Sequence, residues 1–268
     1  MQRGAQKSGR QLPAGLEVEL PYYGDVLDNL ASGRNGGEEG YNQRQREQPG
    51  LGAFFRDLGD EYLHKLGTNG KKIDIDGEAT HARTRLMNST SMERLIRVFD
   101  KYTPSVSEGT IKEFVRDVWA YLTRPGIQDE INNIVAGAFT ERPAVVVGHS
   151  LGSIVAYQVL RTDRRPLKIS LYVTIGSPLG LRAISQQLWP RRFPASIAAW
   201  YNARDKTDYI ALNPLDPNNF PFDRQNPGVA PTIENYDGVR HETPDRHDVV
   251  GYLDDPTVAR GIVDTLIA

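Results

Sequence analysis

The sequence predicts an α/β fold for this chain of 268 residues, with a mostly parallel central sheet flanked by helices. Ala144–Val147 is a short, mostly β-branched run between Pro143 and Gly148, which is typical of a strand buried on both faces of a parallel sheet. From there to the C-terminus, strand-like and helix-like segments alternate, as expected when helices connect parallel strands. We expect residues 1–268 to form a single domain.

The N-terminal part of the chain contains a predicted strand. Leu16–Tyr23 begins by alternating apolar and polar residues and is followed by a turn signal, Gly24-Asp25. We expect the polar segment Met1–Gly15 before it to be a disordered tail. Gly33–Gly50 is rich in Gly, Asn, Gln and Glu and is predicted to be a loop.

Two helices are predicted in the segment that follows this loop. Leu51–Leu66 carries apolar residues at helical spacing, and Ser91–Tyr102 is predicted to be a helix that ends before Pro104. We expect residues 33–104 to form a lid or an insertion. If they form a lid, the candidates for an apolar wall beside a substrate site are Phe54, Phe55, Tyr62 and Leu66. The alternative is that these side chains only pack a peripheral helix.

The clearest amphipathic helix is predicted near residue 111. Apolar residues from Ile111 to Leu122 repeat at helical spacing, and Thr110 with Glu113 forms a capping-box pattern at the start. Pro125-Gly126 breaks this helix, and a second helix is predicted at Gln128–Phe139.

The alternating elements of the C-terminal half complete the predicted fold. The strands are expected at Ala144–Val147, Leu167–Ile175 and Ala198–Asn202, and the helices at Ser150–Leu160, Leu181–Leu188 and Pro256–Ile267.

Composition and charge exclude several classes of protein. The net charge of −2 gives no electrostatic reason to expect a nucleic-acid or acidic-membrane partner. The absence of cysteine excludes disulfides and thiolate chemistry. Met1–Gln11 has no apolar core of a secretory signal, and no run is long enough for a transmembrane helix. We therefore expect a cytoplasmic protein.

The motif that carries chemistry is Gly148-His149-Ser150-Leu151-Gly152. A nucleophile elbow requires a strand, a tight turn and a helix in that order, and the predicted elements supply them. Gly148 and Gly152 would keep the crowded turn free of side chains. Ser150 would be the nucleophile at a helix N-terminus, and the N–H of Leu151 is the expected oxyanion donor. The alternative is a glycine-rich turn in an inert α/β protein.

A serine nucleophile needs a histidine base, and the base needs an orienting carboxylate. Only His241 and His247 follow Ser150, and we favour His247 because a largely apolar stretch and the last helix come after it. Asp205 and Asp208 both follow the predicted strand at Ala198–Asn202. Asp208 is our first choice of acid because an apolar step after it could bury it, and Asp205 is the second.

At these residues the chain resembles the α/β-hydrolase superfamily, in the lipase- and esterase-like branch with a GHSLG elbow. The resemblance spans Ile111–Ala268 and includes Asp208-Tyr209-Ile210-Ala211 as the acid loop and His247 before the last helix. It implies a serine hydrolase that cleaves a carboxylic ester, thioester or amide of a small-molecule acyl substrate through an acyl-enzyme on Ser150. It implies neither a metal nor an organic cofactor.

The chain departs from the family in one respect. The family usually has an early strand ending in His-Gly-x-Gly, which supplies a second oxyanion donor, and no such motif is present. Loss of one donor costs about 10²–10³-fold in turnover. One hypothesis is an N-terminal truncation, with Arg3–Gln6 as a remnant of that loop. The alternative functions are a catalytically impaired scaffold that binds a ligand or protein, and an acyltransferase.

Overall fold

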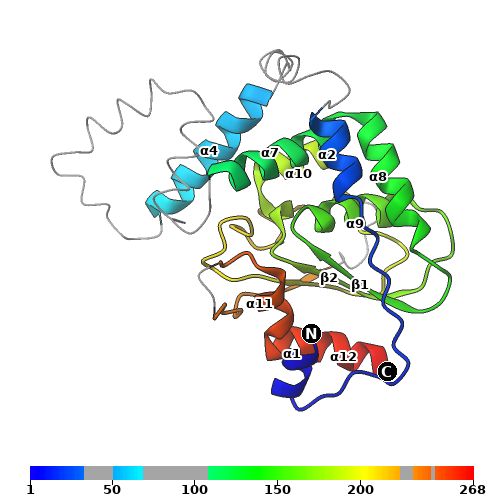
Figure 1. Cartoon of the computed structure of the whole chain (residues 1–268). Coiled ribbons are helices and arrows are strands. Elements are labelled where there is room, and N and C mark those ends of the chain that lie inside the picture. The colour runs from blue at the N-terminus through cyan, green and yellow to red at the C-terminus, as the bar shows by residue number, and fades with distance from the viewer. Residues whose placement is uncertain (33–50, 69–107, 224–231, 243–244) are drawn as a thin grey trace. The chain divides into compact units, whose positions relative to one another are not determined.

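A computed structural model describes residues 1–32, 51–68, 108–223, 232–242 and 245–268 (Figure 1). The chain divides into two compact units, one formed by Met1–Asp28 with Tyr121–Ala268 and the other by Asn29–Ala120. The predicted loop at residues 33–50 and the predicted helix at 91–102 lie outside the described residues. The single domain predicted for residues 1–268 stays a prediction.

In the residues that the structure describes, the first unit contains a four-stranded sheet with all strands parallel, as expected for the predicted α/β class. Its strands are β1 (Ala144–His149), β2 (Ile169–Ile175), β3 (Trp200–Ala203) and β4 (Ile233–Tyr236), paired in the order β1-β2-β3-β4. The first three confirm the predicted strands, with shifts of a few residues at their ends. Because all four strands are parallel, their carboxyl ends meet at one edge of the sheet.

Helices cover both faces of this sheet (Figure 1). One face carries α8 (Pro125–Gly137) and α9 (Leu151–Thr162), and the other carries α1 (Gln2–Lys7), α11 (Val249–Asp254) and α12 (Pro256–Ile267). The aspartates that precede α11 and α12 accept hydrogen bonds from the first backbone amides of those helices, which caps them. The predicted last helix is confirmed, whereas α11 was not predicted.

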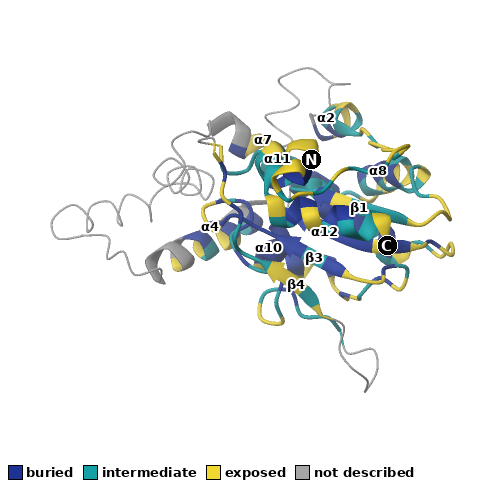
Figure 2. Cartoon of the chain, turned by 90° about the horizontal axis from the view of Figure 1, so that it is seen from below, coloured by how far each residue is buried: buried dark blue, intermediate teal, exposed yellow. Residues whose placement is uncertain are grey.

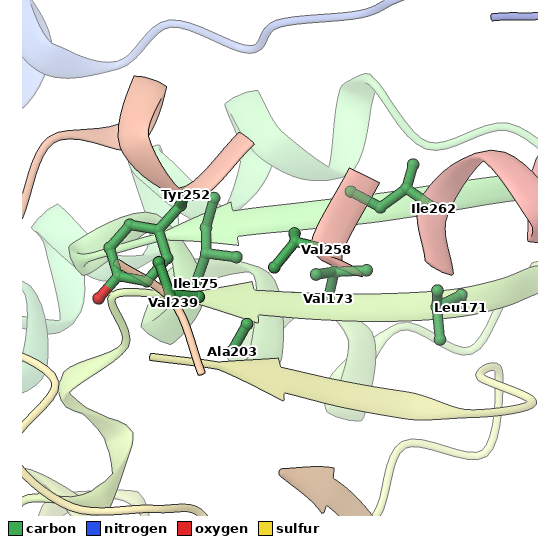
Figure 3. Packing of buried hydrophobic residues seen from close by; sticks show 8 residues of the cluster. All are labelled: Leu171, Val173, Ile175, Ala203, Val239, Tyr252, Val258 and Ile262. Carbon is green, nitrogen blue, oxygen red and sulfur yellow. The ribbon is translucent and has the colours of Figure 1, made fainter. Parts of the chain in front are cut away.

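A hydrophobic cluster joins the sheet to α11 and α12 (Figure 3). Its buried members are Leu171, Val173, Ile175, Ala203, Val239, Tyr252, Val258 and Ile262. Figure 2 shows β3 mostly buried and β4 partly exposed, which fits the place of β4 at the end of the strand order. The cluster fixes α11 against the sheet close to the carboxyl ends of the strands.

The predictions for the N-terminal segment are wrong. Leu16–Tyr23 forms no strand, because Val18 and Leu20 are 79% and 85% exposed and their alternation therefore buries no face. α2 (Gly24–Ser32) takes the place of the predicted turn. Met1–Gly15 contains α1, which packs against α12, instead of being a disordered tail throughout.

The second unit contains α4 (Leu51–Thr68) and most of α7 (Glu108–Thr123), which confirms two predicted helices. α7 begins at Glu108, so Thr110 lies inside the helix and the capping pattern did not mark its start. Phe54 and Tyr62 are buried, and the ring of Phe54 lies 5.1 Å from that of Trp119. The side chains of Phe55 and Leu66 lie outside the described residues.

The remaining helical segment lies between β2 and β3. It consists of η1 (Pro178–Gly180), α10 (Arg182–Ser185) and η2 (Gln186–Leu188), so the predicted helix at Leu181–Leu188 is only partly α-helical. Across the described ranges, no helix combines the length and the apolar character needed to cross a membrane.

The exposure of the N-terminal segment generates a stability prediction. Leu20→Ser should change the free energy of unfolding by less than about 0.5 kcal/mol, because the side chain is already in solvent. Ile262→Ala in the buried cluster should cost about 2–5 kcal/mol. Urea denaturation of both variants measures the difference, and a large loss in Leu20→Ser would contradict the exposed position.

Candidate active site

The turn between β1 and α9 holds Ser150 in a strained backbone conformation. Ser150 has φ 51° and ψ −129°, and it alone among the described non-glycine residues has a positive φ. Such conformations cost about 1–3 kcal/mol and persist where the surrounding structure enforces them. The hydroxyl of Ser153 donates to the carbonyl of Ser150 at 2.6 Å, which fixes the turn from the helix side. This is the geometry expected of a nucleophile elbow.

The two glycines of the motif have different surroundings. A Cβ on Gly148 would lie 2.7 Å from the Cα of Ser153, so β1 and α9 approach too closely for any side chain there. A Cβ on Gly152 would lie 3.5 Å from the hydroxyl of Tyr23, which is ordinary van der Waals contact. The steric requirement predicted for both glycines therefore holds for Gly148 but not for Gly152.

The structure brings Ser150, His247 and Asp208 together in one hydrogen-bonded line. His247 Nε2 lies 2.8 Å from Ser150 Oγ, and His247 Nδ1 lies 2.8 Å from Asp208 Oδ2. The Asp208 side chain is fully buried, and that of His247 is 14% exposed. These are the first-choice nucleophile, base and acid of the sequence prediction.

Within the described residues, four donors surround the carboxylate of Asp208. Its Oδ1 accepts from the backbone amides of Ile210 at 2.7 Å and Ala211 at 3.3 Å. Its Oδ2 accepts from the hydroxyl of Tyr252 at 2.5 Å and from the ring of His247. A buried carboxylate is stable only when hydrogen bonds replace water in this way, so the site keeps Asp208 in a single orientation.

The second-choice residues, Asp205 and His241, form a separate buried pair. His241 Nδ1 lies 3.0 Å from Asp205 Oδ2, and the two side chains are 0% and 1% exposed. Burial opposes the charge on Asp205, but hydrogen bonds from His241 and Thr207 outweigh it and hold the pKa of Asp205 well below its usual range. The described hydrogen bonds of this pair do not include Ser150.

His149, at the variable position of the motif, supports His247 from the side. Its Nε2 lies 2.8 Å from the carbonyl oxygen of His247, and the two rings lie 4.6 Å apart. A carbonyl only accepts, so Nε2 of His149 carries the proton. Burial, together with the nearby His247, lowers the pKa of His149 to about 4, which keeps the ring neutral at neutral pH.

Sequence reasoning missed Tyr252 as a functional residue. Its hydroxyl donates to Asp208 and accepts from the backbone N–H of Asp205 at 3.2 Å, so it joins both aspartates. The only signal in the sequence was its place in the apolar stretch after His247, which predicted packing rather than a hydrogen bond.

The backbone N–H of Leu151 lies in the first turn of α9, where helical amides have no partner within the helix. This place in the helix is compatible with the predicted role of Leu151 as an oxyanion donor, which stays a prediction. The Tyr23 hydroxyl approaches the same turn next to Gly152, although Leu16–Tyr23 is not a strand. Arg3–Gln6, the suggested remnant of an oxyanion loop, lies within α1.

Comparisons with family models, with curated proteins and with solved structures found no match to the chain. No group of three or more His, Asp or Glu side chains is placed to hold a metal ion in the part of the chain that the structure describes.

The two glycines provide a matched test of the elbow. Gly148→Ala should lower the free energy of unfolding by about 1–3 kcal/mol, because its Cβ overlaps the backbone of α9. Gly152→Ala should leave stability nearly unchanged, since its Cβ has room. Chemical denaturation measures both, and an equal loss in the two variants would argue against the close approach at Gly148.

Proposed function

We propose that the chain is a serine hydrolase that cleaves a carboxylic ester, thioester or amide through an acyl-enzyme on Ser150. The observation that carries the proposal is the chain of two hydrogen bonds from Ser150 Oγ through the His247 ring to Asp208 Oδ2, each 2.8 Å long. A strained serine at a helix N-terminus, beside a histidine that a carboxylate orients, is the arrangement that activates a serine hydroxyl.

The hydrogen bonds favour the tautomer of His247 that the chemistry needs. Nδ1 faces the carboxylate of Asp208, an acceptor, so Nδ1 carries the proton in the neutral ring. Nε2 then presents a lone pair to the hydroxyl of Ser150. His149 restrains the same residue by donating to its backbone carbonyl.

In the proposed reaction, Ser150 Oγ attacks the substrate carbonyl carbon while its proton moves to His247 Nε2. The carbonyl oxygen becomes an oxyanion that the N–H of Leu151 stabilises. His247 then gives its proton to the leaving group as the bond to that group breaks. Water, deprotonated by the same His247, then attacks the acyl-enzyme; the bond from the acyl carbon to Ser150 Oγ breaks, and His247 returns the proton to Oγ as the acid leaves.

We also propose that the parallel sheet belongs to the α/β-hydrolase fold. Ser150 follows β1, Asp208 follows β3 and His247 follows β4, so all three lie beyond the carboxyl ends of strands. Their order along the chain, Ser then Asp then His, is the order of that fold. Catalytic groups of parallel sheets are usually found at this edge.

A fluorophosphonate probe tests the activated serine. The wild-type protein should be labelled covalently, Ser150→Ala should not be labelled, and His247→Ala should react about 10⁶-fold more slowly, because no base is left to accept the proton. Mass spectrometry should locate the adduct on the peptide that contains Ser150. Folding of each variant is checked by circular dichroism, and a folded wild-type protein that stays unlabelled would indicate a catalytically silent scaffold.

Asp208→Asn tests the orienting role of the acid. The amide can turn its NH₂ toward His247 Nδ1 and favour the wrong tautomer, so the labelling rate should fall by about 10⁴-fold. Asp216→Asn is the matched control, because Asp216 accepts hydrogen bonds from Asn218 and Asn219 in its own turn. Equal rates in the two variants would remove Asp208 from the mechanism.

A further inference from the structure

Beside the proposed triad lies a second histidine–aspartate pair that the reaction does not use. Asp205 follows β3 on the same loop as Asp208, and His241 lies on the same connection as His247, after β4. Two similar pairs therefore link the same two loops, and only one of them reaches Ser150. The role of the second pair follows from its hydrogen bonds.

Both ring nitrogens of His241 face groups that accept hydrogen bonds. Nδ1 lies 3.0 Å from the carboxylate of Asp205, and Nε2 lies 3.0 Å from the backbone carbonyl oxygen of Asp248. A carbonyl oxygen cannot donate, so Nε2 carries a proton, and the carboxylate is best satisfied by a second proton on Nδ1. The two acceptors therefore fit the imidazolium form of His241, in which the ring forms a buried ion pair with Asp205.

The surrounding hydrogen bonds complete this pair. Asp205 Oδ2 also accepts from the backbone N–H of His241, and Oδ1 accepts from the amide and the hydroxyl of Thr207 at 2.8 Å and 2.6 Å. Burial disfavours the charge on His241, but the hydrogen bonds to Asp205 and to the Asp248 carbonyl outweigh it and raise the pKa of His241. Breaking one partner of such a buried pair leaves an uncompensated charge.

The pair acts on the residue next to the proposed base. Asp248 directly follows His247, and its carbonyl oxygen accepts a hydrogen bond from Nε2 of His241. The ring of His241 also packs edge-on against Tyr252 at 4.7 Å, and the Tyr252 hydroxyl donates to Asp208. Charged His241 thus restrains the backbone after His247 and the tyrosine that orients the acid.

We propose that Asp205 and His241 form a positioning pair, which holds His247 in line with Ser150 by fixing the carbonyl of Asp248. The inference rests on the proposed function, because it assigns to His241 a role in the alignment of that triad. His241 and Asp205 are positioning residues and not catalytic ones, since neither contacts the reacting atoms in the described hydrogen bonds.

The charge on His241 makes this positioning dependent on pH. The groups that face it are the carboxylates of Asp205 and Asp208, the Asp248 carbonyl, and the Tyr252 ring, while Arg246 donates to its backbone carbonyl. Because the pKa is raised in the folded protein, the stabilisation is complete below the ordinary value of 6.5 and is lost as the pH rises through the raised pKa. The proposed activity should therefore have an alkaline limit set by His241.

Gly251→Ala displaces His241 without removing any polar group. A Cβ at residue 251 would overlap Cδ2 and Nε2 of the His241 ring, so the ring and the backbone of α11 cannot keep their present separation. Gly261→Ala on α12 is the matched control, because a Cβ there meets nothing within 4 Å. His241→Gln is a second variant, which removes the charge but keeps a side chain that can donate.

The first readout is the kinetics of fluorophosphonate labelling as a function of pH. Gly251→Ala should lower the maximal labelling rate by about 10²-fold, the cost of misplacing a catalytic group by about 1 Å, with little change in probe affinity. His241→Gln should lower the rate and abolish the alkaline limit. Gly261→Ala should label as wild type does. Wild-type rates and an unchanged pH profile in folded Gly251→Ala and His241→Gln would overturn the proposal.

The second readout does not depend on activity. Nitrogen-15 NMR of histidine-labelled wild-type protein at pH 6, below the ordinary histidine pKa, should show signals of an imidazole with both nitrogens protonated that are missing in His241→Gln. A neutral His241 would overturn the inference even where labelling is normal. If the wild-type protein is not labelled at all, the proposed function fails and the positioning role fails with it, whereas the NMR result still decides whether the buried ion pair exists.

Discussion

The buried carboxylate of Asp208 is the constraint around which the site is organised. Away from water, its oxygens need donors, and the donors come from its own loop, from His247 and from Tyr252 on α11. Satisfying one carboxylate therefore brings together the loop after β3, the loop after β4 and the short helix α11. The hydrogen bond from His247 to Asp208 also turns the other ring nitrogen of His247 toward Ser150. The contact between His247 and Ser150 is therefore a consequence of this arrangement.

The parallel sheet supplies the other half of the arrangement. Since β1, β3 and β4 all end at the same edge, three loops distant in sequence begin close together in space. The hydrophobic cluster then fixes α11 against that edge, with the ring of Tyr252 inside the cluster and its hydroxyl toward the polar site. An apolar body with a polar tip is the property that lets tyrosine connect a core to a buried charge.

The sequence predicted what depends on local pattern. The strand, turn and helix around Ser150 are specified by adjacent residues, and chain order limited the base to two histidines. Leu16–Tyr23 has the alternating apolar and polar residues of a strand but forms none, because this pattern does not reveal whether a neighbouring strand is present to pair with it. β4 is only four residues long and lacks an apolar run, so pairing with β3 defines it. The link through Tyr252 depends on the folding of distant segments and had no local signal.

The hydroxyl of Tyr252 touches the amide of Asp205 and the carboxylate of Asp208, while its ring lies against His241. The loop after β3 and the connection after β4 therefore form part of each other's surroundings. A substitution that is harmless beside one partner can be harmful beside another, because residues that share a hydrogen-bond network have non-additive effects. Variation in these two loops should therefore be epistatic, with changes in one loop accepted only after matching changes in the other.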